Sequence, residues 1–149
     1  MKSYLQILII LNFIFLNQCY SQNETSKYYI TDIRGDISLQ MEINNLQSNN
    51  GIIYIRILDE NENPVIVGTS SVIYQSAKIS FDSISAGKYA IQFFHDENEN
   101  QKMDFNLIGI PKEKFGSSND VKPVLGPPKF EKMLFEIYED KKIVMQPVN

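Results

Sequence analysis

Cysteine is nearly absent from this 149-residue chain, because the single one, Cys19, lies in an N-terminal segment that we expect to be removed. The remaining domain then has no disulfide and must be stabilised by its hydrophobic core, alone or with a metal. It has no thiol nucleophile, and it lacks the Gly-x-Ser-x-Gly pattern that places a serine nucleophile on a strained turn. These absences argue against an enzyme.

An excess of positive charge is also lacking. Without Lys2, 13 basic residues remain against 18 acidic ones, a net charge of −5. Negative charge disfavours binding to the phosphates of nucleic acids and to anionic lipid surfaces. We therefore expect no nucleic-acid partner.

Residues 1–21 have the features of a secretory signal peptide. Lys2 supplies the positive charge, and the apolar run 5–16 is shorter than the roughly 20 residues that span a membrane. Cys19 and Ser21 place small side chains before a cleavage point. We expect a secreted or periplasmic protein. The alternative is a lipid anchor on Cys19, which would hold the protein at an outer membrane surface, but Gln18 is larger than the residue that usually precedes a lipidated cysteine.

The remainder of the chain reads as a flexible N-terminal segment, 22–34, followed by one domain, 35–149. Apolar residues alternate with polar ones over Ile37–Ile43, and the apolar stretch 52–58 is typical of a central strand. Further strands are expected at 65–74, 78–81, 89–94, 133–137 and 143–148. No helical period follows the signal peptide. About seven strands predict an all-β fold, a single antiparallel β-sandwich of immunoglobulin-like or transthyretin-like type, with a small closed barrel as the alternative.

Two segments stand out within this pattern. The stretch 84–89 resembles the tyrosine corner of β-sandwiches, so Tyr89 should be buried with its hydroxyl bonded to nearby backbone. The segment 105–129 has no period and is too long for an ordinary connection, which suggests a functional loop. Its apolar residues should anchor it to the domain; they are Ile108, Ile110, Phe115, Val121 and Leu125.

The loop 96–104 has oxygen-bearing residues at the alternate positions that calcium loops use. The expected ligands are the side chains of Asp96, Asn98, Asn100 and Asp104 and the backbone carbonyl of Lys102. Gln101 occupies the position where such loops usually carry glycine, and Leu107 stands where a bidentate glutamate is usual. Glu113 could complete the shell if the long segment folds back. We expect any affinity to be in the range of about 10⁻⁴–10⁻³ M.

The chain contains its own control for this interpretation. The letters Asp-Glu-Asn-Glu-Asn also occur at 59–63, but Pro64 follows and no second carboxylate arrives. We interpret that copy as a turn between strands, since Asp and Asn bond their own backbone there. His95 is expected to pack and hydrogen-bond at a strand end, although a hydrolase using His95 and Asp96 is an alternative.

Several motifs follow one another in order along the second half of the chain: His95-Asp96, the acidic loop, Gly109-x-Pro111-x-Glu113, Gly116-x-Ser118-Asn119 and 126–128. In this ordered set the chain resembles a family of secreted bacterial proteins, the domain of unknown function 2141 family. The resemblance runs from about residue 37 to the C-terminus and implies secretion and a compact β-rich domain. It implies no activity. We expect a monomeric binding or accessory module for an unknown protein or glycan ligand, or else a purely structural domain without metal.

Overall fold

The structure, a computed structural model, describes residues 26–30, 35–124 and 127–148. The predicted signal peptide, 1–21, with Cys19, lies outside the described residues, and so does Leu125. No helix in the described part is long and apolar enough to cross a membrane.

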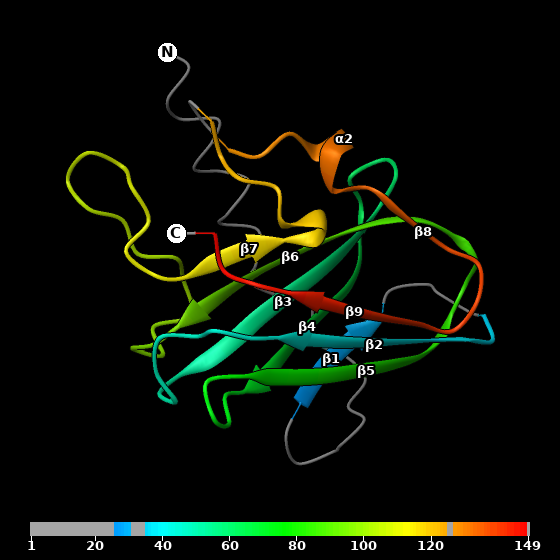
Figure 1. Cartoon of the computed structure of the whole chain (residues 1–149), viewed down its shortest axis with the longest axis horizontal. Coiled ribbons are helices and arrows are strands. Elements are labelled where there is room, and N and C mark those ends of the chain that lie inside the picture. The colour runs from blue at the N-terminus through cyan, green and yellow to red at the C-terminus, as the bar shows by residue number, and fades with distance from the viewer. Residues whose placement is uncertain (1–25, 31–34, 125–126, 149) are drawn as a thin grey trace.

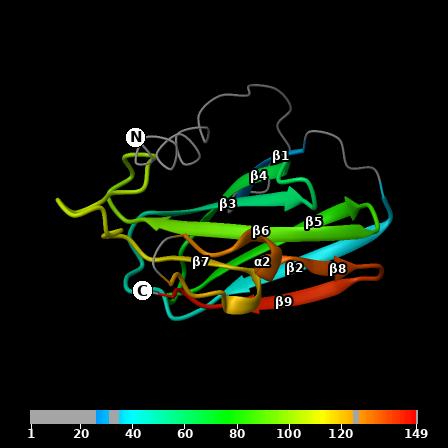
Figure 2. The ribbon, with the colours of Figure 1, turned by 90° about the horizontal axis from the view of Figure 1, so that it is seen from above.

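Two sheets face each other and contain nine strands in the part of the chain described (Figure 1). Figure 2 shows them as two layers. The larger sheet has the order β1 (Ser26–Ile30), β4 (Pro64–Ser71), β3 (Ile52–Asp59), β6 (Gly87–Asp96) and β7 (Phe115–Ser117), and β8 (Phe135–Ile137) also pairs with β6. The smaller sheet has the order β5 (Ala77–Ile84), β2 (Ile37–Ile43) and β9 (Lys141–Met145). The predicted all-β sandwich is confirmed, and the barrel alternative is wrong for these strands.

The core lies between the inner faces of the two sheets. Alternate residues of β2, β3 and β6 point inward, as a period of two requires. From the larger sheet the core includes Ile53, Ile55 and Ile91, and from the smaller sheet Leu39 of β2 and Phe81 of β5, all fully buried. This apolar contact between layers is the main stabilising term for a domain without disulfides.

The outer face of β6 is covered as well. A one-turn helix, α2 (Phe130–Met133), and a 3-10 turn, η1 (Ser118–Asp120), pack near it. Met133 of α2 joins Leu58 and Ala90 in a second apolar cluster. Both faces of β6 are therefore mostly buried, whereas its sequence predicts only a strand whose side chains alternate between two faces.

The tyrosine corner is confirmed. Tyr89 is buried, and its hydroxyl donates to the Ser85 backbone carbonyl at 2.9 Å. Burial raises the pKa of the Tyr89 phenol, and the charge of Asp59 raises it further.

Several expectations need correction. Ser26–Ile30, inside the segment expected to be flexible, is a strand paired with β4, because Tyr28, Tyr29 and Ile30 are strong strand formers. The sandwich is not wholly antiparallel, since β9 pairs with β2 in parallel. The expected strand 133–137 begins only at Phe135, because Met133 belongs to α2.

The long segment 105–129 also differs from expectation. It includes β7 and η1, so it is not structureless. Two of its expected anchors, Ile108 and Ile110, are exposed, whereas Val121 packs against the second cluster and Phe115 is half-buried in β7. The segment therefore packs down in its middle, around β7 and η1.

Candidate functional site

The loop 96–104 starts from a rigid point at the end of β6. Asp96, the last residue of β6, is fully buried and lies opposite Ile52 in the register with β3. Gly51 precedes that strand with a φ of +78°, and an added Cβ would lie 2.0 Å from the Asp96 carbonyl oxygen. Only glycine permits this close approach at positive φ.

The Asp96 carboxylate organises the beginning of the loop. One oxygen accepts the backbone N–H of Asn100 at 3.1 Å, and the other accepts the N–H of Gln101 at 2.6 Å. Because the carboxylate is buried, these charge-assisted bonds fix the loop against the strand end.

Asp104 closes the loop from its other end. Its Oδ2 accepts the side-chain amides of Asn98 at 2.7 Å and Asn100 at 3.0 Å. The Oδ1 atoms of the same two asparagines accept the backbone N–H groups of Asn100 and Lys102. The predicted residues Asp96, Asn98, Asn100 and Asp104 are thus brought together, and Lys102 joins them through its own N–H.

Two residues of the loop have left-handed backbone. Glu99 has a φ of +57° and Gln101 a φ of +66°. Side chains other than glycine are disfavoured in this region by about 1–2 kcal/mol each. The concern raised by Gln101 at the glycine position is therefore confirmed, and the loop adopts the tight conformation despite it.

Glu113 reaches the loop from the long segment. Its Oε2 accepts the Asp104 backbone N–H at 3.1 Å, and the neighbouring Lys112 N–H donates to the Asp104 carbonyl at 2.8 Å. Burial raises the pKa of the Glu113 carboxyl above its ordinary value of 4.5, and the nearby charges of Asp96 and Asp104 raise it further, although backbone hydrogen bonds oppose the shift. The charges of two loop residues thus act on a carboxylate from a separate segment.

The raised pKa of Glu113 predicts that the stability of the protein depends on pH when a chelator keeps calcium away. Folding raises the pKa of Glu113, so the folded state holds the carboxyl proton more tightly than the unfolded state does. The contribution of Glu113 to the unfolding free energy is therefore largest below its ordinary pKa of 4.5, and it is lost as pH rises through the raised pKa of the folded state. We expect the unfolding free energy of the wild type, minus that of Glu113→Gln, to decrease over that interval. Denaturant unfolding at a series of pH values measures it.

The Asp104→Asn variant is the internal control, because removing one of the like charges should reduce this decrease. A difference between wild type and Glu113→Gln that stays constant with pH would contradict the strained carboxylate.

The copy at 59–63 is built differently. Asp59 accepts the N–H groups of Asn61 at 2.9 Å and Asn63 at 2.8 Å, and also the Asn63 side-chain amide at 3.0 Å. A single carboxylate thus satisfies its own turn, and these hydrogen bonds lower the pKa of Asp59 although burial opposes them. Its interpretation as a turn fits this geometry.

His95 occupies a buried position on the core side. One ring nitrogen, Nε2, lies 2.6 Å from the Asn50 carbonyl oxygen, and Nδ1 lies 3.5 Å from a Glu97 carboxylate oxygen. Asp96 is the next residue of the strand, so its side chain points to the opposite face. The two buried side chains are therefore directed to different faces of β6.

Sequence reasoning missed Tyr54. Its ring stacks on Phe94 of the neighbouring strand, with centroids 5.1 Å apart. Burial raises the pKa of the Tyr54 phenol, as do the charges of Asp96 and Glu99. The β3–β6 register places Tyr54 beside Phe94, and that register is a tertiary feature.

Among the residues that the structure describes, no three His, Cys, Asp or Glu side chains form a group able to hold a metal ion. Within the loop, Asp96 accepts hydrogen bonds from backbone amides and Asp104 accepts them from asparagine side-chain amides. Any cation here would need amide and carbonyl oxygens as well as carboxylates.

The chain was compared with known proteins. The model of a family described as an uncharacterized protein conserved in bacteria, DUF2141, matches residues 41–146. Neither the comparison with curated proteins nor the comparison with solved structures gave a match. The matched range includes the loop 96–104, Glu113 and most of both sheets.

Proposed function

The chain belongs to the DUF2141 family of uncharacterized bacterial proteins, and from that premise we propose that it is an exported, non-catalytic module that binds calcium through its loop 96–104. One observation carries the proposal. Glu113, from a separate segment, is bonded to the backbone of Asp104 and is close enough to Asp96 and Asp104 for their charges to raise its pKa. A cation would relieve this repulsion, because it favours the ionised form of each carboxylate.

The proposed ligands are carboxylate, amide and carbonyl oxygens, as calcium prefers. An amide oxygen has two lone pairs, so the Oδ1 atoms of Asn98 and Asn100 can keep their backbone bonds and still offer a pair to a cation. Asp104 would exchange its two amide partners for the ion. The proposed set is Asp96, Asn98, Asn100, the Lys102 carbonyl, Asp104 and Glu113. Its three carboxylates do not form a metal-holding group in this structure, so the proposal requires that the ion draw them together.

The proposed affinity is low. Binding would break the hydrogen bonds that the Asn98 and Asn100 amides donate to Asp104, and this rearrangement reduces the net free energy of binding. The left-handed backbone of Glu99 and Gln101 is present without an ion, so it is a cost of folding. Weak sites of about 10⁻⁴–10⁻³ M are common in extracellular modules, where calcium is abundant, and this agrees with the proposed export.

The positions of His95 and Asp96 at the end of β6 support a non-catalytic role. His95 and Asp96 are buried on opposite faces of β6, so they offer no shared approach to a substrate. We propose that the monomeric module binds a protein or glycan outside the cytoplasm. A structural domain without metal is the alternative that the following experiment distinguishes.

Calcium is expected to raise the unfolding free energy of the wild type by about 2.7 kcal/mol at a concentration of about 100 Kd. The Asp104→Asn variant should lose most of this gain, because it removes one of the two carboxylates that stand at ligand positions within the loop. Glu113→Gln should weaken it. Thermal unfolding across a calcium titration measures all three proteins.

Asp59→Asn is the matched control, since its loop has the same five letters but carries Val67 at the position that corresponds to Asp104. This variant should lose some basal stability with its hydrogen bonds, yet keep the full calcium-dependent gain. Magnesium should substitute poorly, because it requires tighter octahedral geometry. A wild type with no shift at millimolar calcium would leave the metal-free structural domain as the function.

A further inference from the structure

A hairpin at 105–111, here called the apolar tip, projects away from both sheets (Figure 1, yellow-green). Four large apolar side chains lie on it within six residues, and Leu107 and Ile108 are 106% and 79% exposed. The other two, Phe105 and Ile110, are also exposed. Single exposed apolar residues are ordinary, but a contiguous group marks an interaction surface.

The apolar tip has a regular internal structure. Asn106 Oδ1 accepts the backbone N–H groups of Ile108 at 3.0 Å and Ile110 at 2.9 Å. The Asn106 N–H donates to the Ile110 carbonyl, and the Gly109 N–H donates to the Asn106 carbonyl. Four backbone N–H groups therefore have hydrogen-bond partners within the apolar tip itself. The tip can enter an apolar medium without leaving these groups unpaired.

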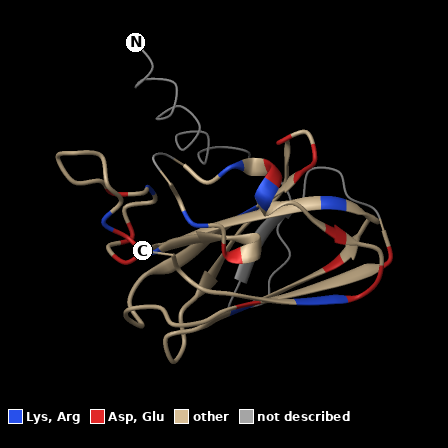
Figure 3. Ribbon diagram, turned by 45° about the horizontal axis from the view of Figure 1, so that its top comes forward, with Lys and Arg blue, Asp and Glu red and all other residues tan. Residues whose placement is uncertain are grey.

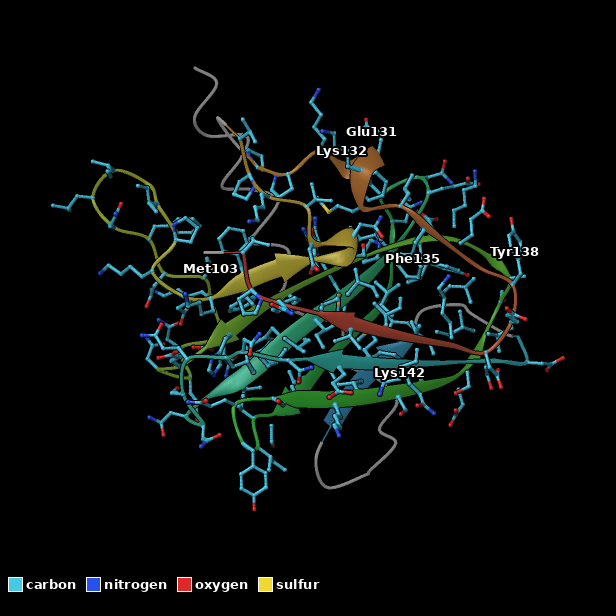
Figure 4. The ribbon with its side chains drawn as sticks, in the orientation of Figure 1. Met103, Glu131, Lys132, Phe135, Tyr138 and Lys142 are labelled. Carbon is cyan, nitrogen blue, oxygen red and sulfur yellow. The ribbon has the colours of Figure 1, made fainter. Side chains whose placement is uncertain are left out.

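Charge is distributed around the apolar tip in a particular way. The segment 105–111 contains no charged residue. Figure 3 shows this segment in tan, with basic residues (blue) and acidic residues (red) where it joins the domain. Of the basic residues there, Lys102 and Lys112 are exposed, whereas the acidic Glu113 is buried and Asp104 is half-buried. Met103, also half-buried, lies at the same base (Figure 4). The long lysine side chains can extend toward a surface that the tip enters.

We propose that the apolar tip inserts into the interface of an anionic lipid bilayer, with Lys102 and Lys112 against lipid phosphates. A convex tip that exposes apolar side chains suits a fluid lipid surface. The net charge of −5 argued against such a surface, and acidic residues outnumber lysines over 96–114 as well. Most of those acidic side chains are buried or half-buried, however, so among the exposed charges of this stretch Lys102 and Lys112 outnumber Glu99. At physiological salt, charges beyond about 8 Å are screened, which limits the effect of the rest of the protein. This inference is independent of calcium binding.

The chain has no tryptophan, so Leu107→Trp introduces a single reporter at the apolar tip. In the full chain, with chelator present to exclude calcium bridging, phosphatidylglycerol vesicles should shift its emission to the blue. Tyr74→Trp is the matched control, because Tyr74 is 90% exposed on a different loop and should show no shift.

Vesicle sedimentation tests the residues themselves. The double substitution Leu107→Ser/Ile108→Ser should weaken binding at least about tenfold, because it removes two of the apolar side chains that would be buried. Val144→Ser, at an exposed position on β9, should not. Lys102→Glu/Lys112→Glu should abolish the preference for phosphatidylglycerol over phosphatidylcholine vesicles. The inference is overturned if the Leu107→Trp emission is unchanged by vesicles, or if both tryptophan variants shift equally.

Discussion

Gly51→Ala is expected to destabilise the protein by at least about 3 kcal/mol, among the larger effects of a single substitution. The new Cβ would lie 2.0 Å from the Asp96 carbonyl oxygen and 2.6 Å from the Glu97 Cα, both backbone atoms that cannot rotate away. The positive φ of +78° adds a further cost of about 1–2 kcal/mol for any side chain. Urea unfolding monitored by circular dichroism measures the change.

Gly109→Ala separates the two contributions. Gly109 has nearly the same φ, +80°, but no described atom lies within 4 Å of its added Cβ. Its substitution should therefore cost only about 1–2 kcal/mol. Equal losses in the two variants would mean that backbone conformation, and not the close approach of Gly51 to Asp96, accounts for the effect.

Gly51→Ala should also reduce the calcium-dependent gain in stability. The clash displaces the backbone at Asp96 and Glu97, where the loop 96–104 begins. Gly109→Ala alters the apolar tip only and should leave that gain unchanged.

Phe81→Ala is expected to cost about 3–5 kcal/mol, because it empties a fully buried position between the two sheets. Phe81 lies on β5 and faces the larger sheet, so its ring contributes to the contact between layers. The loss combines lost burial with an unfilled cavity. Denaturant unfolding gives the change directly.

Phe105→Ala is the control for Phe81→Ala, because it makes the same substitution at an exposed position. Phe105 is 42% exposed at the start of the apolar tip, so its loss should change the unfolding free energy by about 0.5 kcal/mol or less. The same variant should nevertheless bind anionic vesicles more weakly. A large loss of stability would show that Phe105 packs against the domain and would place it outside the proposed lipid contact.

Local signals in the sequence predicted much of the fold. The alternation over 37–43 and the apolar run 52–58 predicted β2 and β3 nearly to the residue, because one buried face imposes a period of two. The turn before Tyr89 predicted its buried, hydrogen-bonded ring, since that corner is built from residues close in sequence. The candidate loop could be located for the same reason, because most of its bonds join residues two to six apart.

The sequence by itself thus determined an all-β domain, its principal strands and the position of the acidic loop. Only the tertiary structure decided the parallel pairing of β9 with β2 and the covering of β6 on both faces, because strand partners are chosen by packing over long separations. It also decided that Ile108 and Ile110 are exposed and that Glu113 meets Asp104. Hydrophobicity alone does not say which side of a hairpin meets a core, and no local period connects a carboxylate to a loop nine residues away.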